Sequence, residues 1–277
     1  GGSLICKGDP ALNRITKYIA QMPQSDFKAS TVYIRIKNAD GTYNVYSPFY
    51  TPTLKKLDSF ELHIGLSYSK WIVKAYGVQI EITIFVPQGA HTLLQDIKVT
   101  NVSGKELEID VIPVYEFTHF NALMQLTNAD WVPQTMTLNG HKEASGHVVL
   151  EQYAFMKKQY AVNLVTCERP VTSFEGDRRV FLGENEYGSF ANPLSLQKSE
   201  LSNSECVRGD NVAALMIHLG KMAAGATQRT CTQLTQKASI AEAQDEIKKY
   251  RDLANVDKAF EQLSAWWSKY LTAIQIE

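Results

Sequence analysis

The sequence lacks the features that would mark a nucleic-acid-binding, membrane or secreted protein. Its 28 basic and 29 acidic residues leave a formal charge of -1, and no run of Lys and Arg reaches five, so the positive field that holds nucleic acid or anionic lipid is missing. No stretch approaches the roughly 20 apolar residues of a membrane span. The opening residues Gly1-Gly2-Ser3-Leu4 lack the order of a signal peptide. We therefore expect no nucleic-acid or membrane partner, and a cytoplasmic protein.

Motifs for metals, redox chemistry and common hydrolases are also missing. The cysteines are widely spaced and form no CxxC pair, so we expect reduced, mostly buried thiols rather than a zinc or redox site. The histidines never fall at helical i and i+4 spacing, and the P-loop, GxSxG and HExxH motifs are all missing. We therefore expect no metal site. The cysteines are Cys6, Cys167, Cys206 and Cys231, and the histidines are His63, His91, His119, His141, His147 and His218.

Alternation of apolar and polar residues from about residue 30 to 117 predicts a series of antiparallel strands. Val32, Ile34 and Ile36 alternate with polar residues and Tyr33, and Asp40-Gly41 follows as a hairpin turn signal. Further strands are expected at 43–45, 60–68, 69–76, 78–86, 93–100 and 107–115. One face of this sheet should be buried and the other solvated. The acids expected on the solvated face are Glu81, Glu106, Glu108 and Asp110.

The rest of the chain predicts more strands, two irregular regions and a helical end. Strands resume at 147–153, 159–167, 212–219 and 227–234, the last two as a hairpin-type pair, while 119–140 and 174–204 are expected to be irregular. Helices are predicted at 241–253 and 256–274, the second capped by Asn255. An apolar stripe on this helix must pack on the sandwich or on a following domain; it consists of Phe260, Leu263, Trp267, Tyr270, Leu271 and Ile274. The predicted fold is a large antiparallel β-sandwich over residues 1–237, followed by a helical linker over 238–277.

Aromatic and amide residues crowd the first irregular region. Planar side chains that stack on sugar C–H groups, next to amides that bond sugar hydroxyls, predict a carbohydrate site. Ordinary closure of the core is an equally good interpretation for Tyr115 and Phe117, whereas the polar surroundings of Trp131 favour binding. The residues concerned are Tyr115, Phe117, His119, Phe120, Asn121, Asn128, Trp131 and Gln134.

Paired loop carboxylates would suit glycoside chemistry. The alternative for each acid is an ordinary solvated loop residue. The candidates are Glu116, Asp130, Asp177 and Glu184.

Taken in order along the chain, a set of short motifs resembles the amino-terminal domain of glycoside hydrolase family 94, which includes cellobiose, cellodextrin and chitobiose phosphorylases. The motifs are Arg14-Ile15-Thr16-Lys17-Tyr18, Tyr33-Ile34-Arg35, Tyr46-Ser47-Pro48, residues 60–69, residues 78–87, residues 98–103, Tyr115-Glu116-Phe117, Thr127-Asn128, residues 177–183, and Trp266-Trp267 to Gln275-Ile276-Glu277. The resemblance implies a supersandwich of the galactose mutarotase-like type, a helical linker and then an (α/α)6 catalytic barrel. Because the chain begins without Met and stops where that barrel should begin, we expect a fragment that lacks the barrel.

The resemblance also implies a function and a site. Family members carry out inverting phosphorolysis of β-linked oligosaccharides to a sugar 1-phosphate, with inorganic phosphate as co-substrate and with no metal or organic cofactor. They form homodimers in which a sandwich loop helps cover the partner's active site. By position this loop corresponds to Thr127, Asn128, Trp131 and Gln134, and no catalytic residue can be assigned. A free-standing carbohydrate-binding module and a structural sandwich that docks a partner are the alternatives.

Overall fold

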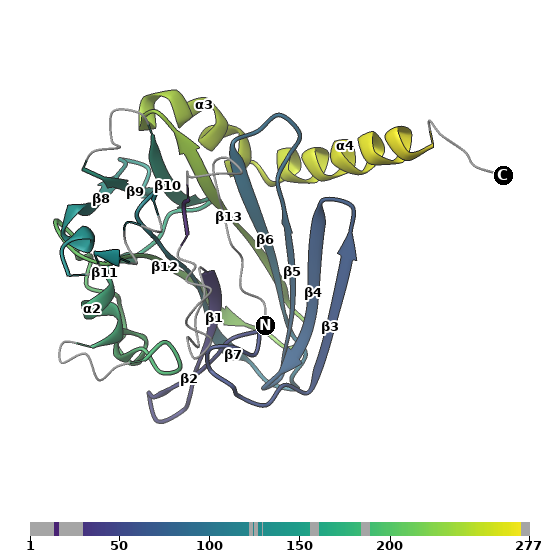
Figure 1. Cartoon of the computed structure of the whole chain (residues 1–277). Helices are drawn as coiled ribbons and strands as arrows, with labels where there is room; N and C mark the ends of the chain where they lie inside the picture. The colour runs from purple at the N-terminus through teal and green to yellow at the C-terminus, as the bar shows by residue number, and fades with distance from the viewer. Residues whose placement is uncertain are drawn as a thin grey trace.

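The computed structural model describes residues 14–16, 30–121, 124, 127–128, 130–155, 161–183 and 189–272, which form two antiparallel sheets and a few helices (Figure 1). The strands are β1 Ser30–Lys37, β2 Tyr43–Tyr46, β3 Ser59–Gly65, β4 Tyr68–Ala75, β5 Val78–Phe85, β6 Thr92–Asn101, β7 Leu107–Glu116, β8 Met136–Lys142, β9 Val148–Ala154, β10 Val162–Cys167, β11 Ser173–Asp177, β12 Asn211–Met222 and β13 Thr227–Lys237. The helices are η1 Val132–Thr135, α2 Arg178–Leu182, η2 Leu194–Gln197, α3 Ile240–Arg251 and α4 Leu253–Leu271.

The two sheets face each other as a sandwich. The large sheet has the order β3-β4-β5-β6-β13-β10-β9-β8 and the small sheet the order β11-β12-β7-β1-β2. The alternation along β5 sets the core: Ile80, Ile82 and Ile84 are buried between the sheets, while Glu81 on the opposite face is half-buried. The predicted antiparallel β-sandwich is therefore confirmed.

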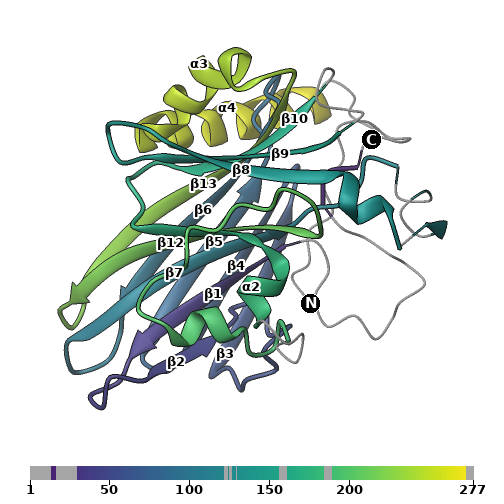
Figure 2. The ribbon, with the colours of Figure 1, turned by 90° about the vertical axis from the view of Figure 1, so that its left-hand side faces the viewer.

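The prediction of a solvated outer face is wrong for the small sheet. Tyr33 and Arg35 of β1 and Asp110 of β7 are all buried on that face, because α2 and residues 189–201 cover it with a second apolar cluster that includes Phe181 and Leu196. Figure 2 shows α2 on this side of the sandwich and α3 and α4 on the other. Asp110 is satisfied there by an ion pair to Arg35 at 2.7 Å.

The expected hairpin between the last two strands is also wrong. Strand β12 pairs with β7 in the small sheet, whereas β13 pairs with β6 in the large sheet. The turn that links them, like the turn between β6 and β7, crosses from one sheet to the other. Alternation shows which face of a strand is buried, but it does not identify the neighbouring strand.

Two strands lie in the regions that were expected to be irregular. Strand β8 forms the far edge of the large sheet and β11 an edge of the small one. Gly140 of β8 lies where a Cβ atom would stand 2.3 Å from the Phe174 ring of β11, so the glycine is needed for this close approach. The same glycine interrupts the apolar alternation that would have revealed the strand.

The two long helices pack on the outer face of the large sheet. Ile247 of α3 contacts the outer residues of β10, and Leu263 of α4 lies in one cluster with Phe85 and Leu94. The predicted cap Asn255 is wrong, because the Asp252 side chain accepts the Ala254 N–H at 3.0 Å. The predicted stripe is buried at Leu263 and exposed toward Tyr270 and Leu271, and Ile274 lies outside the described residues. The boundary between residues 237 and 238 stays a prediction.

Three cysteines, Cys167, Cys206 and Cys231, are free and buried, as expected, and Cys6 lies outside the described residues. Across the part of the chain that the structure describes, no helix has the length and apolarity that a membrane crossing requires.

Candidate functional site

The loop between β7 and β8 carries the residues that the sequence singled out. Its backbone is held by local hydrogen bonds: the Asn128 N–H donates to Met124 O and the Val132 N–H donates to Asn128 O, both at 3.0 Å. Val132 is fully buried and fixes the loop to the sandwich, immediately before the short helix η1. This anchor holds the residue next to it, Trp131, at a defined place on the surface, where 47% of its side chain is exposed.

The four predicted loop residues lie together in this segment. The Asn128 amide donates to the Thr127 hydroxyl at 2.9 Å and to Met124 O at 3.2 Å. The Gln134 N–H donates to Trp131 O at 3.0 Å, and the Gln134 side chain is exposed. The loop therefore carries one exposed aromatic side chain, with amide and hydroxyl residues before and after it in the sequence, and these are the residue types that bind a sugar ring.

The remaining aromatic residues of this region belong to the core. Tyr115 and Phe117 are buried, and the Tyr115 hydroxyl lies 3.1 Å from the Thr232 hydroxyl and 3.3 Å from Gln95 Oε1. His119 is buried against the ring of Phe120, with ring centroids 4.2 Å apart. Burial holds the pKa of His119 below its usual range. These residues close the end of the sandwich. Of the two interpretations left open for Tyr115 and Phe117, the structure supports core closure.

Two of the candidate carboxylates have structural partners. Glu116 is buried and lies 2.9 Å from Nε of Arg178. Asp177 caps α2 by accepting the Arg179 N–H at 2.7 Å. Asp130 is exposed in the loop, and Glu184 lies outside the described residues.

Sequence reasoning missed a buried acid near the same end of the small sheet. Glu175 is fully buried, and its carboxylate accepts the Gly176 N–H at 3.1 Å and the Asp177 N–H at 3.3 Å, together with the Ser202 hydroxyl. Burial raises the pKa of this carboxyl. Because these bonds tie β11 to the segment around residue 202, the acid holds the covering layer in place. No signal in the sequence distinguishes it from an ordinary strand-end acid.

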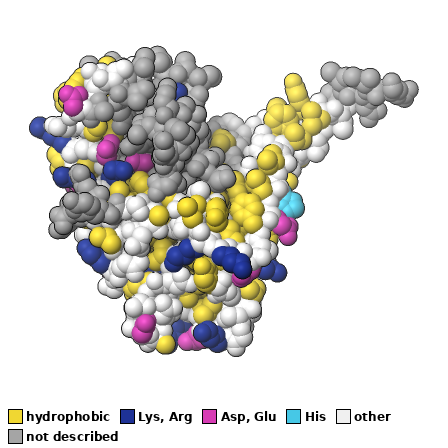
Figure 3. All heavy atoms as spheres, turned by 60° about the horizontal axis from the view of Figure 1, so that its bottom comes forward, with side chains coloured by type: hydrophobic (Ala, Val, Ile, Leu, Met, Phe, Trp, Pro, Cys, Tyr) yellow, Lys and Arg dark blue, Asp and Glu magenta, His cyan; other side chains and the backbone are white. Residues whose placement is uncertain are grey.

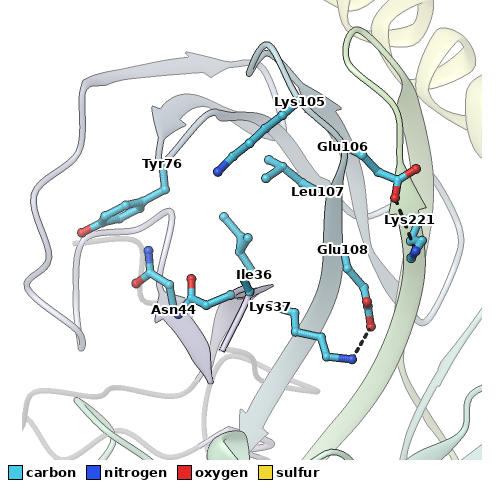
Figure 4. Close-up of a pocket in the computed structure, with 11 residues that line it drawn as sticks. Ile36, Lys37, Asn44, Tyr76, Lys105, Glu106, Leu107, Glu108 and Lys221 are labelled. Atoms are coloured by element: carbon cyan, nitrogen blue, oxygen red, sulfur yellow. Dashed lines mark hydrogen bonds and ion pairs between the residues drawn. The ribbon is translucent and has the colours of Figure 1, made fainter. Parts of the chain in front are cut away.

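A second feature is an open cavity of about 580 Å³ at the opposite end of β7 (Figure 4). Its floor includes Ile36 and Leu107, and the Lys105 side chain reaches over Leu107 into the hollow. Nearby, Lys37 pairs with Glu108 at 3.2 Å. The cavity is thus separate from the loop that carries Trp131. Within the described ranges, no group of three or more His, Cys, Asp and Glu side chains is placed to hold a metal ion.

Comparison with known proteins gives one family match over most of the chain. The model of the glycosyl hydrolase 94 supersandwich domain matches residues 1–253. An N,N'-diacetylchitobiose phosphorylase of Vibrio furnissii is 26% identical over 269 residues, which cover 96% of this chain and 32% of that protein. A cellobionic acid phosphorylase of Neurospora crassa is 26% identical over 243 residues, covering 86% of this chain and 29% of that protein.

The chain therefore spans about a third of the length of the curated relatives that it matches. Among solved structures, a bacterial glucoamylase complexed with acarbose aligns with a TM-score of 0.59 at 12% identity, over 96% of this chain and 33% of that chain. At that identity the likeness concerns the fold alone.

Proposed function

Because the chain belongs to the glycosyl hydrolase 94 supersandwich family, we propose that it is the non-catalytic amino-terminal portion of a phosphorylase that acts on β-linked oligosaccharides. In this proposal a catalytic barrel domain uses inorganic phosphate to release a sugar 1-phosphate, with no metal or organic cofactor, in the cytoplasm. The sandwich supports dimerisation and positions the loop of Thr127, Asn128, Trp131 and Gln134 over an active site.

The family match carries this proposal, and the extent of the match supports it. The relatives named as phosphorylases are about three times as long as the matched region, which leaves ample room for a separate catalytic domain. The loop supports the second part. Trp131 is exposed although its neighbour Val132 is fully buried, so the backbone is fixed while the indole stays available for a ligand.

A phosphorylase assay tests the first part. We expect the purified chain to release no phosphate from a sugar 1-phosphate and a glucose or disaccharide acceptor above the rate of a protein-free blank. Turnover by this chain alone, at the rates usual for enzymes, would contradict a non-catalytic role.

A matched pair of variants tests the loop in the longer protein that the proposal requires. Trp131→Ala should lower kcat/KM by about 10-fold to 100-fold, because a stacking contact of about 1.4–2.7 kcal/mol is lost. Tyr50→Ala removes an aromatic of similar exposure, 45%, from the loop after β2 and should leave kcat/KM within about two-fold. Equal effects of the two substitutions would count against a role for the loop.

The exposure of Trp131 also favours a second candidate, a free-standing carbohydrate-binding module. In that case the chain itself should bind cello-oligosaccharides or another β-glucan in calorimetry, and Trp131→Ala should abolish the heat of binding. The absence of binding to every β-glucan tested would eliminate this candidate and leave the first one standing.

A further inference from the structure

Among the strands that the structure describes, β3 forms a free edge of the large sheet, and it exposes an apolar row. It is the outermost strand in Figure 1. Phe60 and Leu62 are 44% exposed and Ile64 is 78% exposed. Phe60 and Leu62 stand opposite Val73 and Trp71 of β4, which are buried between the sheets. The apolar inner face of the sandwich therefore continues to an uncovered edge, and hydrophobic side chains lie on the surface beside the protruding helix α4 (Figure 3).

The hairpin geometry shows which backbone groups of β3 are unused. A two-residue turn, Leu66-Ser67, joins the paired residues Gly65 and Tyr68, and such a turn closes on a hydrogen-bonded pair. Hydrogen-bonded pairs then recur at every second residue, so residues 59, 61, 63 and 65 bond to β4. The N–H and C=O groups of residues 60, 62 and 64 consequently point away from the sheet, along the free edge.

The other edges of the two sheets are protected in ways that β3 is not. Strand β2 has only four residues, and β11 has five with a shift in register. Strand β8 is bridged at Leu138 by Cys206. Strand β3 has seven residues, a regular register, and neither Pro nor Lys in its sequence SFELHIG. Proteins normally use short strands, bulges, Pro or Lys to prevent edge pairing, so this edge is suited to association.

We propose that β3 pairs antiparallel with β3 of a second copy of this chain, about a two-fold axis at Leu62. In this register Leu62 faces Leu62, and Phe60 faces Ile64 in both directions. These are the residues with free backbone groups, and each such pair exchanges two hydrogen bonds. On the other face of the strand, Glu61 of each copy faces His63 of the other. The sequence of β3 is therefore complementary to itself in apolar contact and backbone hydrogen bonding, and Glu61 can bond the His63 ring of the second copy as it contacts His63 of its own strand at 3.3 Å.

A two-fold pairing uses the same edge in both copies, so the assembly closes as a dimer and does not grow further. It joins the two large sheets into one continuous sheet and covers the apolar row. The inference builds on the proposed dimerisation, for which it names the surface. The loop of Trp131 lies near β8, at the opposite edge of the same sheet, so this pairing does not by itself bring the loop to the second copy.

Sedimentation equilibrium of the chain tests the association. We expect twice the chain mass for the unmodified protein. Leu62→Lys, which places two ammonium groups face to face on the axis, should raise the dissociation constant of the dimer by about 100-fold or more. Val102→Lys is the matched control, since Val102 is 48% exposed in the turn after β6, and should change the dissociation constant by less than about two-fold. A monomeric unmodified chain, or larger aggregates, would overturn the inference.

Two further sets of variants test the register. In a Cys6→Ser background, Leu62→Cys should form an interchain disulfide on mild oxidation, because Cα atoms of a hydrogen-bonded pair lie about 5.5 Å apart. Glu61→Cys should cross-link much less, because the two copies of residue 61 are offset along the strands. Glu61→Lys should weaken the dimer, and Glu61→Lys combined with His63→Glu should restore it.

These outcomes separate the inference from the proposed function. A dimer that is insensitive to Leu62→Lys and fails to cross-link at residue 62 would overturn the β3 interface and leave dimerisation itself intact. The loop variants at Trp131 report on the phosphorylase role whatever the mass of the chain.

Discussion

His218 should make the stability of this domain depend on pH in the alkaline range. Its ring lies on β12 between two carboxylates, with Nδ1 hydrogen-bonded to Asp110 and Nε2 at 2.9 Å from Glu200. Arg35 also donates to Asp110, at 2.7 Å. The hydrogen bond to Asp110, supported by Glu200, stabilises the protonated ring and raises the pKa of His218 from 6.5 to about 9.

The sign of the effect follows from this raised pKa. The folded protein holds the proton more tightly than the unfolded chain, so the stabilisation is fully present below about pH 6.5 and is lost as the pH rises through about 9. A shift of this size corresponds to at most about 3.4 kcal/mol. The ring is 30% exposed and Glu200 is 46% exposed, and solvent screening reduces the expected contribution to about 1–2 kcal/mol.

Urea unfolding of the protein and of His218→Gln measures this contribution. At pH 6 the variant should be less stable by about 1–2 kcal/mol, and the difference should shrink toward zero near pH 10. Comparing the two proteins at each pH cancels the titration of other groups. His141→Gln serves as control: His141 lies 3.2 Å from Glu151 but is 46% exposed, so its replacement should cost less than about 0.5 kcal/mol at either pH. A difference for His218→Gln that stays constant from pH 6 to pH 10 would refute the reasoning.

Two further predictions concern packing. Gly140→Ala should reduce the free energy of unfolding by about 1–3 kcal/mol in urea titration, because the new Cβ would stand 2.3 Å from the Phe174 ring; Gly104→Ala, with no atom within 4 Å, is the control, and equal stabilities would contradict the steric account. Trp267→Phe removes the indole N–H that donates to Ser67 Oγ at 2.6 Å, so exchange of amide hydrogens in residues 264–272 should accelerate by about two-fold to ten-fold by mass spectrometry. Unchanged exchange rates would show that this bond does not hold the end of α4.

Most strands could be predicted because their burial follows from near neighbours in the sequence. Along β5 and β6 one face meets the core and the other faces outward, so apolar and polar residues alternate and the boundaries are found to within a residue or two. The loop of Trp131 stays a prediction, and it could be proposed from the sequence because its four candidate residues lie within eight positions of each other. A candidate site whose residues are contiguous in the sequence can be proposed without knowledge of the fold.

Features that depend on distant segments could not be found in this way. Arg35 donates to the carbonyl groups of Leu196, Lys198 and Ser199, so the covering layer over the small sheet is fixed by a buried cation more than 150 positions away in the sequence. Asp110 was expected in solvent because it alternates with apolar residues, and only this covering layer makes it a buried acid. The layer itself contains Gly and Pro and has no periodic pattern.

Dependence on distant segments also explains why β3 and β5 have the same pattern in the sequence. Phe60, Leu62 and Ile64 alternate with polar residues just as Ile80, Ile82 and Ile84 do, yet the first row is 44–78% exposed and the second at most 5% exposed. Apolar residues alternate along a strand when one of its faces is buried. That face can be buried by another chain as well as by the same chain. A strand that has the pattern of a core strand but lies at an edge of the described sheet is therefore a candidate for pairing with another chain. In the β3 pairing proposed above, in which Glu61 faces His63 about Leu62, that neighbour is a second copy of the same strand.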